Sequence, residues 1–110
     1  MALTILTAAP TTEPPSPGVV VAGKIDQCWL GGGPRNVCEI EVSGASMDVT
    51  PHRWSPGLGK WIPSIAGAAT LNTGPRELRI EDGILSAYRC LVRTGGAGTG
   101  TYYPADVDER

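Results

Sequence analysis

The stretch VCEIEV, from Val37 to Val42, alternates apolar and acidic residues, and this pattern decides the fold class of the 110-residue chain. Successive side chains of a β-strand point to opposite faces of the sheet, so Cys38, Ile40 and Val42 share one face and the two glutamates share the other. A strand with one apolar and one solvated face is typical of an antiparallel sheet. The stretch therefore predicts a half-buried strand in a β-protein.

Residues 76–92 carry a second signal, in which two β-prone runs are separated by Asp82-Gly83. An Asp-Gly pair between such runs predicts a hairpin, because a type I′ turn needs positive φ at both central residues. A two-residue loop places Ile80 opposite Leu85. The second run is apolar on both faces, which predicts that its strand is the more central of the two.

Shorter β-prone runs complete the expected set of strands. They are Val19–Ala22, Lys60–Ile62 and Thr101–Tyr103. Residues 43–61 contain Pro51 and Pro56 and are expected to be irregular up to the short strand at Lys60, because proline breaks strand pairing.

The composition limits the class of protein. With 15 glycines and 10 prolines, the chain is too rich in turn residues for a helical bundle. The formal net charge of −2 offers no basic excess to hold phosphates, so we expect no nucleic-acid partner. No apolar run approaches the roughly 20 residues of a membrane helix, so we expect no membrane partner. The expected fold class is all-β.

We expect three parts along the chain. Residues 1–18 are interpreted as an extended proline-rich N-terminal arm, because prolines favour polyproline-like conformations and cannot pair in a ladder. This arm is either a disordered tail or a segment that becomes ordered along a partner. Residues 19–104 form the β-domain, which Pro104 ends, and residues 105–110 form an acidic tail.

The first seven residues contain no basic region, and threonines break their apolar stretch, so we expect no secretion signal. A chain that stays in the cytosol keeps its cysteines as thiols, and their odd number argues against a disulfide framework. Cys38 and Cys90 are expected to be small buried hydrophobes. A Cys28–Cys38 disulfide across the glycine loop 31–33 is geometrically feasible in an oxidising setting.

No arrangement of residues indicates catalysis or a cofactor. His52, the single histidine, lies in an expected polar loop, and no motif places a nucleophile beside it. The cysteines lack the spacing of metal ligands, and neither glycine cluster precedes a helix that could hold a phosphate. We therefore expect no enzyme activity, no metal and no cofactor.

The aromatic residues point to contacts rather than to chemistry. Three tryptophans and no phenylalanine are unusual in so short a chain. We expect Trp61 in the core, because Ile62 and Ile65 are near it. Trp29 and Trp54 lie beside loops, where they either pack the loop or anchor a protein contact.

The order of these elements resembles that of the small β-sandwich modules in structural proteins of tailed bacteriophages. An alternating strand is followed by a tryptophan-containing strand, a threonine-rich connector, a Tyr-Arg strand, a glycine-rich turn and a last strand. The residues that carry the resemblance are Val42-Ser43-Gly44, Gly59–Pro63, Ala87-Tyr88-Arg89 and Thr101-Tyr102-Tyr103.

The resemblance implies a small antiparallel β-sandwich of immunoglobulin-like or related topology. It further implies a non-enzymatic virion protein, made in the host cytoplasm, which decorates the capsid as a homo-oligomer and binds the major capsid protein or another virion protein. The arm would reach onto a neighbour, and Val19–Ala22 would add a strand to an exposed sheet edge. The expected partner-binding residues are Val19, Val20 and Val21 of that strand and the aromatic anchors Trp29, Trp54, Tyr102 and Tyr103.

Two alternatives remain open at this point. The chain could be a tail or fibre module that recognises a host surface glycan or protein, because exposed aromatic rings also stack on sugars. A small cytosolic enzyme ranks last, since no acid–base pair is evident.

Overall fold

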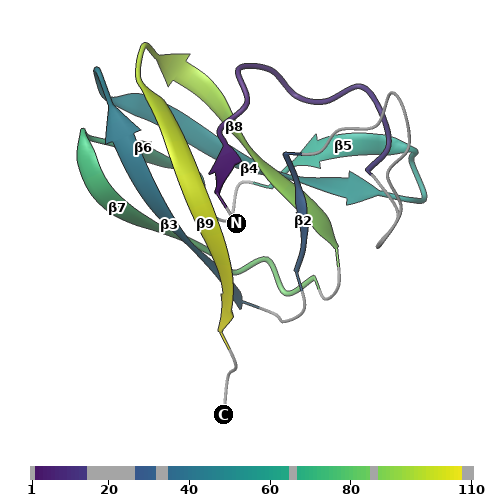
Figure 1. Ribbon diagram of the computed structural model, residues 1–110. Helices are drawn as coiled ribbons and strands as arrows, with labels where there is room; N and C mark the ends of the chain where they lie inside the picture. The colour runs from purple at the N-terminus through teal and green to yellow at the C-terminus, as the bar shows by residue number, and fades with distance from the viewer. Residues whose placement is uncertain (1, 15–26, 32–34, 65–66, 85–86, 108–110) are drawn as a thin grey trace.

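The computed structural model describes residues 2–14, 27–31, 35–64, 67–84 and 87–107. Within these residues the chain forms strands and no helix, and the strands make two antiparallel sheets (Figure 1). The predicted all-β class is therefore confirmed. The architecture is that of a small β-sandwich, with a core between the sheets.

The two sheets are named here after one strand of each. The β3 sheet contains, in spatial order, β1 (Leu3–Thr4), β9 (Thr99–Val107), β3 (Arg35–Ser43) and β7 (Gly74–Ile80). The β8 sheet contains β2 (Trp29–Leu30), β8 (Tyr88–Gly96), β4 (Met47–Ser55) and β5 (Lys60–Pro63), and β6 (Ala69–Leu71) also pairs with β4.

The alternating stretch predicted as a strand forms the middle of β3. Cys38, Ile40 and Val42 are buried, whereas Glu39 and Glu41 are exposed on the opposite face. The buried side chains join a core that both sheets supply. Its members include Leu78 and Ile80 of β7, Met47 and Val49 of β4, Leu91 of β8 and Tyr102 of β9.

The hairpin predicted over residues 76–92 is wrong. β7 pairs with β3 in one sheet, so that Ile80 lies opposite Asn36, while β8 belongs to the other sheet. Asp82-Gly83 makes a corner between the sheets, and Gly83 has the positive φ of 74° that was expected of it. The predicted partner Leu85 lies outside the described residues. β7 lies at the edge of its sheet, whereas β8 lies between β2 and β4, so the prediction that the second run forms the more central strand is confirmed.

The expectation that residues 43–61 are irregular is also wrong, because β4 occupies nine of them. Pro51 is tolerated in its middle for a geometric reason. Along β4, residues 47–49 pair with β6, and the pairing with β5 begins at His52. Pro51 falls in the gap, where its carbonyl accepts a bond from the Ser64 N–H and its missing N–H interrupts no ladder.

The start of the chain packs on the sandwich, which differs from the arm expected over residues 1–18. β1 pairs with β9, and Leu3 and Ile5 are buried in the main core. At Leu6 the chain passes to the other sheet, where its N–H donates to the Leu91 carbonyl at 3.0 Å. The alternation of buried Leu3, exposed Thr4 and buried Ile5 is a strand pattern that the proline content of the segment obscured.

The other end of the predicted domain also extends further than expected. β9 continues through Pro104 to Val107 and pairs with β3 along this length. The short strands expected at Lys60–Ile62 and Thr101–Tyr103 are confirmed as parts of β5 and β9. The run Val19–Ala22 lies outside the described residues.

A second apolar cluster lies on the outer face of the β8 sheet. Leu91 of β8 faces the main core, so the adjacent Cys90 and Val92 point outward. This outer cluster consists of Trp61, Cys90 and Val92, with Leu6, Cys28, Trp54 and Tyr88 packed against it. The N-terminal segment continues from β1 toward β5 (Figure 1). Leu6 therefore covers part of the outer cluster, which neither sheet of the sandwich covers.

Candidate interaction surface

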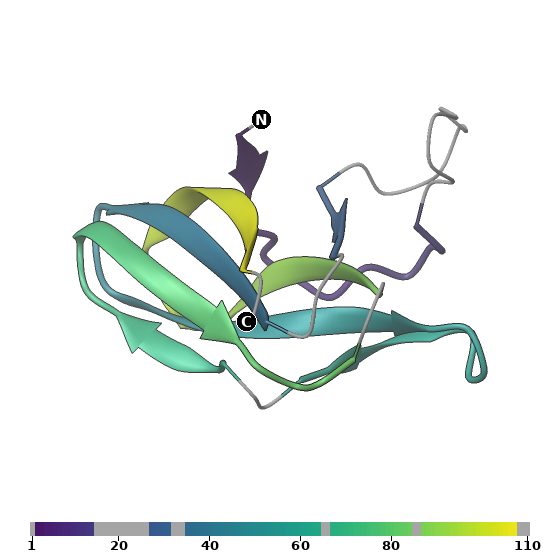
Figure 2. The same ribbon diagram turned by 90° about the horizontal axis from the view of Figure 1, so that it is seen from below.

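The β4–β5 hairpin carries two tryptophans that face each other across the strands. Trp54 and Trp61 are register partners, and their rings meet edge to face with centroids 5.8 Å apart and an interplanar angle of 65°. Trp61 is buried, as predicted, whereas Trp54 keeps part of its surface exposed. The hairpin projects beyond the rest of the sandwich (Figure 2).

The N-terminal segment around Thr12 lies against this tryptophan pair and is hydrogen-bonded to it. The Trp61 Nε1–H donates to the Thr12 carbonyl at 2.7 Å, so the indole holds the backbone of a proline-rich segment. Between the segment and the hairpin lies an open groove of about 290 Å³. Its lining residues, which define the Trp groove, are Pro10, Thr11, Trp54, Gly59, Lys60 and Trp61.

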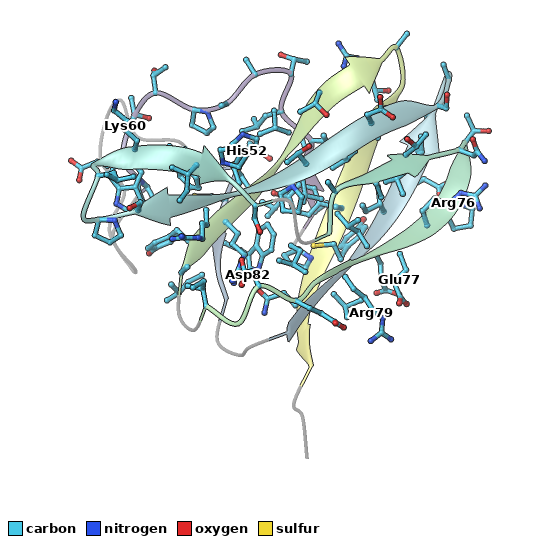
Figure 3. All side chains as sticks on the ribbon, turned by 180° about the vertical axis from the view of Figure 1, so that it is seen from behind. His52, Lys60, Arg76, Glu77, Arg79 and Asp82 are labelled. Atoms are coloured by element: carbon cyan, nitrogen blue, oxygen red, sulfur yellow. The ribbon has the colours of Figure 1, made fainter. Side chains whose placement is uncertain are left out.

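The tip of the hairpin adds an exposed apolar side chain and a cation to this surface. Leu58 is 65% exposed at the turn, which is closed by the Gly59 N–H donating to the Ser55 carbonyl at 2.8 Å. Gly59 has a φ of 64°, a conformation that glycine adopts without strain. Lys60 stands beside the turn (Figure 3). The Trp groove thus combines aromatic faces with a single positive rim charge.

A second exposed aromatic residue, Tyr103, lies on the outer face of the β3 sheet. It is 48% exposed and pairs across β9 and β3 with Glu39, which in turn lies opposite Glu77 of β7. Like charges directly opposite on a sheet repel each other. Arg79 relieves part of this repulsion through an exposed ion pair with Glu77 at 3.3 Å (Figure 3). This face is charged, in contrast to the Trp groove.

The structure does not bring the predicted partner-binding residues together. Trp54 and Tyr103 lie on different sheets, and Val19, Val20 and Val21 lie outside the described residues. Tyr102 is fully buried, and its hydroxyl donates to the Gln27 carbonyl at 3.0 Å.

Trp29 packs edge to face on Tyr102, with ring centroids 5.6 Å apart. It is only partly exposed, and its buried Nε1–H has no hydrogen-bond partner among the residues that the structure describes. Trp29 and Tyr102 therefore build the interior, while Trp54 and Tyr103 are the predicted residues that offer surface for a contact.

A buried polar network that sequence reasoning missed closes one end of the sandwich. Arg89, 1% exposed, donates from Nη2 to Asp82 at 2.7 Å and from Nη1 to the Asn36 side chain at 2.6 Å. The second Asp82 oxygen accepts a bond from the Ser64 hydroxyl at 3.3 Å. The arginine within an otherwise apolar run at residues 87–92 was the signal available, because buried charges in proteins are paired.

His52 lies in β4 rather than in a polar loop, so that expectation is wrong. It is 7% exposed, and its Nδ1 lies 3.1 Å from the Thr50 carbonyl of the same strand. Its register partners are Pro63 on β5 and Cys90 on β8. The His52 ring is therefore held by a contact with the backbone of its own strand.

The described residues contain no group of three histidine, cysteine, aspartate or glutamate side chains that could hold a metal ion. They also contain no helix that is long and apolar enough to span a membrane. Comparisons with protein-family models, curated proteins and solved structures find no match to the chain.

Proposed function

We propose that the protein is a non-enzymatic structural protein of a tailed-bacteriophage virion, a capsid decoration protein that binds the major capsid protein lattice. The observation that carries the proposal is the Trp groove at the end of the projecting hairpin. A partly exposed Trp54, backed by a buried Trp61 and flanked by an exposed Leu58, offers a rigid apolar anchor. Tryptophan is enriched among the residues that dominate protein–protein binding energy.

The proposed action is mechanical. A protein that binds only the assembled lattice shifts the equilibrium toward that lattice by mass action. Many copies on one capsid would act together, since each copy contacts the same repeating surface. The modest net charge of −2 favours a contact made by apolar burial rather than by attraction to a phosphate backbone.

The second candidate function is recognition of a host surface glycan by a tail or fibre protein. The partly exposed face of Trp54 beside Lys60 and Thr11 favours it, because an aromatic face with polar groups at its rim suits a sugar ring. The groove of about 290 Å³ has room for little more than one such ring.

Co-sedimentation with expanded capsids of the encoding phage tests the first candidate. The full chain is expected to pellet with the capsids at a fixed ratio. Trp54→Ala and Leu58→Ser are expected to weaken binding by about 30-fold, because loss of an interface anchor costs roughly 2 kcal/mol. Absence of co-sedimentation across salt and pH would reject a decoration role.

Tyr103→Ala serves as the matched control, since it removes an exposed aromatic residue from the other sheet. It is expected to pellet like the unmodified chain. If Tyr103→Ala loses binding while Trp54→Ala keeps it, the protein docks through the β3 sheet instead. Binding to a glycan array that Trp54→Ala abolishes, without any capsid binding, would favour the second candidate.

A further inference from the structure

Cys28 and Cys90 pack in the same outer cluster, beside the junction of β2 and β8. The register of these strands pairs Trp29 with Arg89 and Leu30 with Tyr88. Cys28 directly precedes β2, and continuing this register by one residue would place it opposite Cys90. Both side chains belong to the outer cluster, so they project from the same face of the sheet.

The hydrogen-bond pattern indicates how close the two cysteines are. The Gly31 N–H donates to the Ala87 carbonyl at 3.1 Å, which marks Gly31 and Ala87 as a hydrogen-bonded pair. Hydrogen-bonded and non-hydrogen-bonded pairs alternate along an antiparallel ladder, so the same register continued to Cys28 and Cys90 would make them a non-hydrogen-bonded pair. Such pairs have Cα atoms about 4.5 Å apart, which lies within the range that a disulfide spans.

The third cysteine is placed differently. Cys38 lies in β3, opposite Leu78 and Pro104, and its side chain is buried in the main core between the sheets. The outer cluster that holds Cys28 lies on the far side of the β8 sheet. The Cys28–Cys38 disulfide that the sequence left open for an oxidising setting would have to pass through that sheet, so the structure does not support it.

We propose that Cys28 and Cys90 form a redox-sensitive disulfide site that fastens β2 to β8 across the outer face of the sandwich. The structure records no disulfide among the three cysteines. Oxidation would fix the short β2 at the edge of its sheet. It would also fix the adjacent Gln27, whose carbonyl accepts the Tyr102 hydroxyl. This inference does not depend on the proposed function.

The reaction is two thiol–disulfide exchanges with a small disulfide such as oxidised glutathione. Cys28, which is partly exposed, is the thiol that such an oxidant reaches, whereas Cys90 is fully buried. The Cys28 thiolate attacks one glutathione sulfur and releases the first glutathione thiolate. The Cys90 thiolate then attacks the Cys28 sulfur of the mixed disulfide and releases the second. The two protein thiols are oxidised, and one glutathione disulfide is reduced to two glutathione molecules that carry their protons.

Peptide mapping of the oxidised full chain tests the proposal directly. Trypsin separates the cysteines into the peptides 25–35, 36–53 and 90–93. The folded protein is incubated with oxidised glutathione at about pH 9 until the mass of the intact chain stops changing, because the buried Cys90, with its pKa raised to about 12, reacts through a small thiolate fraction. The product is digested without reduction. The expected product links 25–35 to 90–93, and the intact chain loses two hydrogen atoms. The oxidised chain is expected to melt at a higher temperature than the reduced one.

Two variants provide the controls. Cys38→Ser is expected to form the same link, and Cys28→Ser is expected to form none. A link between 25–35 and 36–53, a stable glutathione adduct on 25–35, a disulfide-linked dimer or an unchanged mass would each overturn the proposal. If a variant fails to fold, the peptide map of the unmodified chain still shows whether Cys28 is linked to Cys90.

Discussion

The Arg89 guanidinium donates to the Asp82 carboxylate across 2.7 Å, and their side chains are only 1% and 11% exposed. Asp82 stands at the corner where the chain leaves β7 for the other sheet, while Arg89 is near the start of β8. The same carboxylate accepts the Ile84 N–H at 3.0 Å and thereby shapes the corner. The pair joins the two sheets at a point where no ladder does so.

Removal of one member of this pair is expected to destabilise the protein strongly. Asp82→Asn should lower the free energy of unfolding by about 3 kcal/mol, because it leaves the buried guanidinium without its counter-charge. Urea denaturation measures the effect. The control is Glu77→Gln, which breaks the exposed ion pair with Arg79 and should cost at most about 0.5 kcal/mol. Equal effects of the two substitutions would contradict a structural role of the buried pair.

Gly83 is expected to be required for its backbone conformation and not for space. Its φ is 74°, and a Cβ built on it would meet no atom within 4 Å. Gly83→Ala should therefore destabilise the fold by about 1 kcal/mol through strain alone. Gly57 has equally open surroundings without a positive φ, so Gly57→Ala should be nearly neutral in the same thermal melts. A neutral Gly83→Ala would show that the corner tolerates a side chain.

The amino-terminal residues are expected to stabilise the folded domain itself. Ile5 is 6% exposed in the main core, so Ile5→Ala should cost about 2–4 kcal/mol through lost burial and the cavity it leaves. Thr4→Ala, on the exposed side of the same segment, should change stability little. Chemical denaturation of both variants gives the comparison. If Ile5→Ala left the denaturation curve unchanged, the first residues would be an arm that does not stabilise the domain.

Alkaline pH is expected to destabilise the reduced protein through Cys90. Burial, with Cys28 as a second cause, raises the pKa of the Cys90 thiol from 9.0 to about 12. The unfolded chain therefore loses this proton at lower pH than the folded chain, and the free energy of unfolding falls as pH rises from about 9 toward 12. The titratable neighbours on the packed elements are His52 across β4, Cys28 beside β2 and Tyr88 on β8.

The measurement is denaturation under reducing conditions at several pH values, with Cys90→Ala as the comparison. A difference of about 3 pH units between the two pKa values corresponds to as much as ~4 kcal/mol across the whole range. Burial also raises the pKa values of Tyr102 and Tyr88, so these two groups add to the loss of stability that Cys90 causes in the unmodified chain. The variant should show a shallower decline. If the free energy of unfolding fell equally steeply with pH in both proteins, Cys90 would not be a cause of the alkaline destabilisation.

Short-range patterns predicted several elements correctly. The alternation in β3 predicted which side chains are buried, because the facing of a strand residue depends only on its neighbours along the chain. The burial of Trp61, Cys38 and Cys90 followed from similar local reasoning. The positive φ of Gly83 also followed from its immediate neighbours, although the hairpin around it did not form.

The surface around Trp54 could be predicted only in part. The sequence identified Trp54 as a candidate contact residue beside a loop. The Trp groove is also lined by Pro10 and Thr11, which lie more than forty positions before Trp54 in the chain. Tyr102 and Tyr103 are adjacent and equally β-prone, yet one is fully buried and the other 48% exposed. Which of them faces the core depends on how β9 is set between β1 and β3.

Residue order along the chain thus determined the all-β class and the facing of individual strands, since both depend on contacts between near neighbours. Only the tertiary structure decided the partners of β7 and β8, the strand through Pro51, the burial of Leu3 and the ionic pair of Arg89 with Asp82. Each of these depends on apolar surface or charge supplied from a distant part of the chain. Cys28 likewise shares an apolar cluster with Cys90 and not with Cys38, because the packing of the sheets, and not separation in sequence, sets which thiols are neighbours.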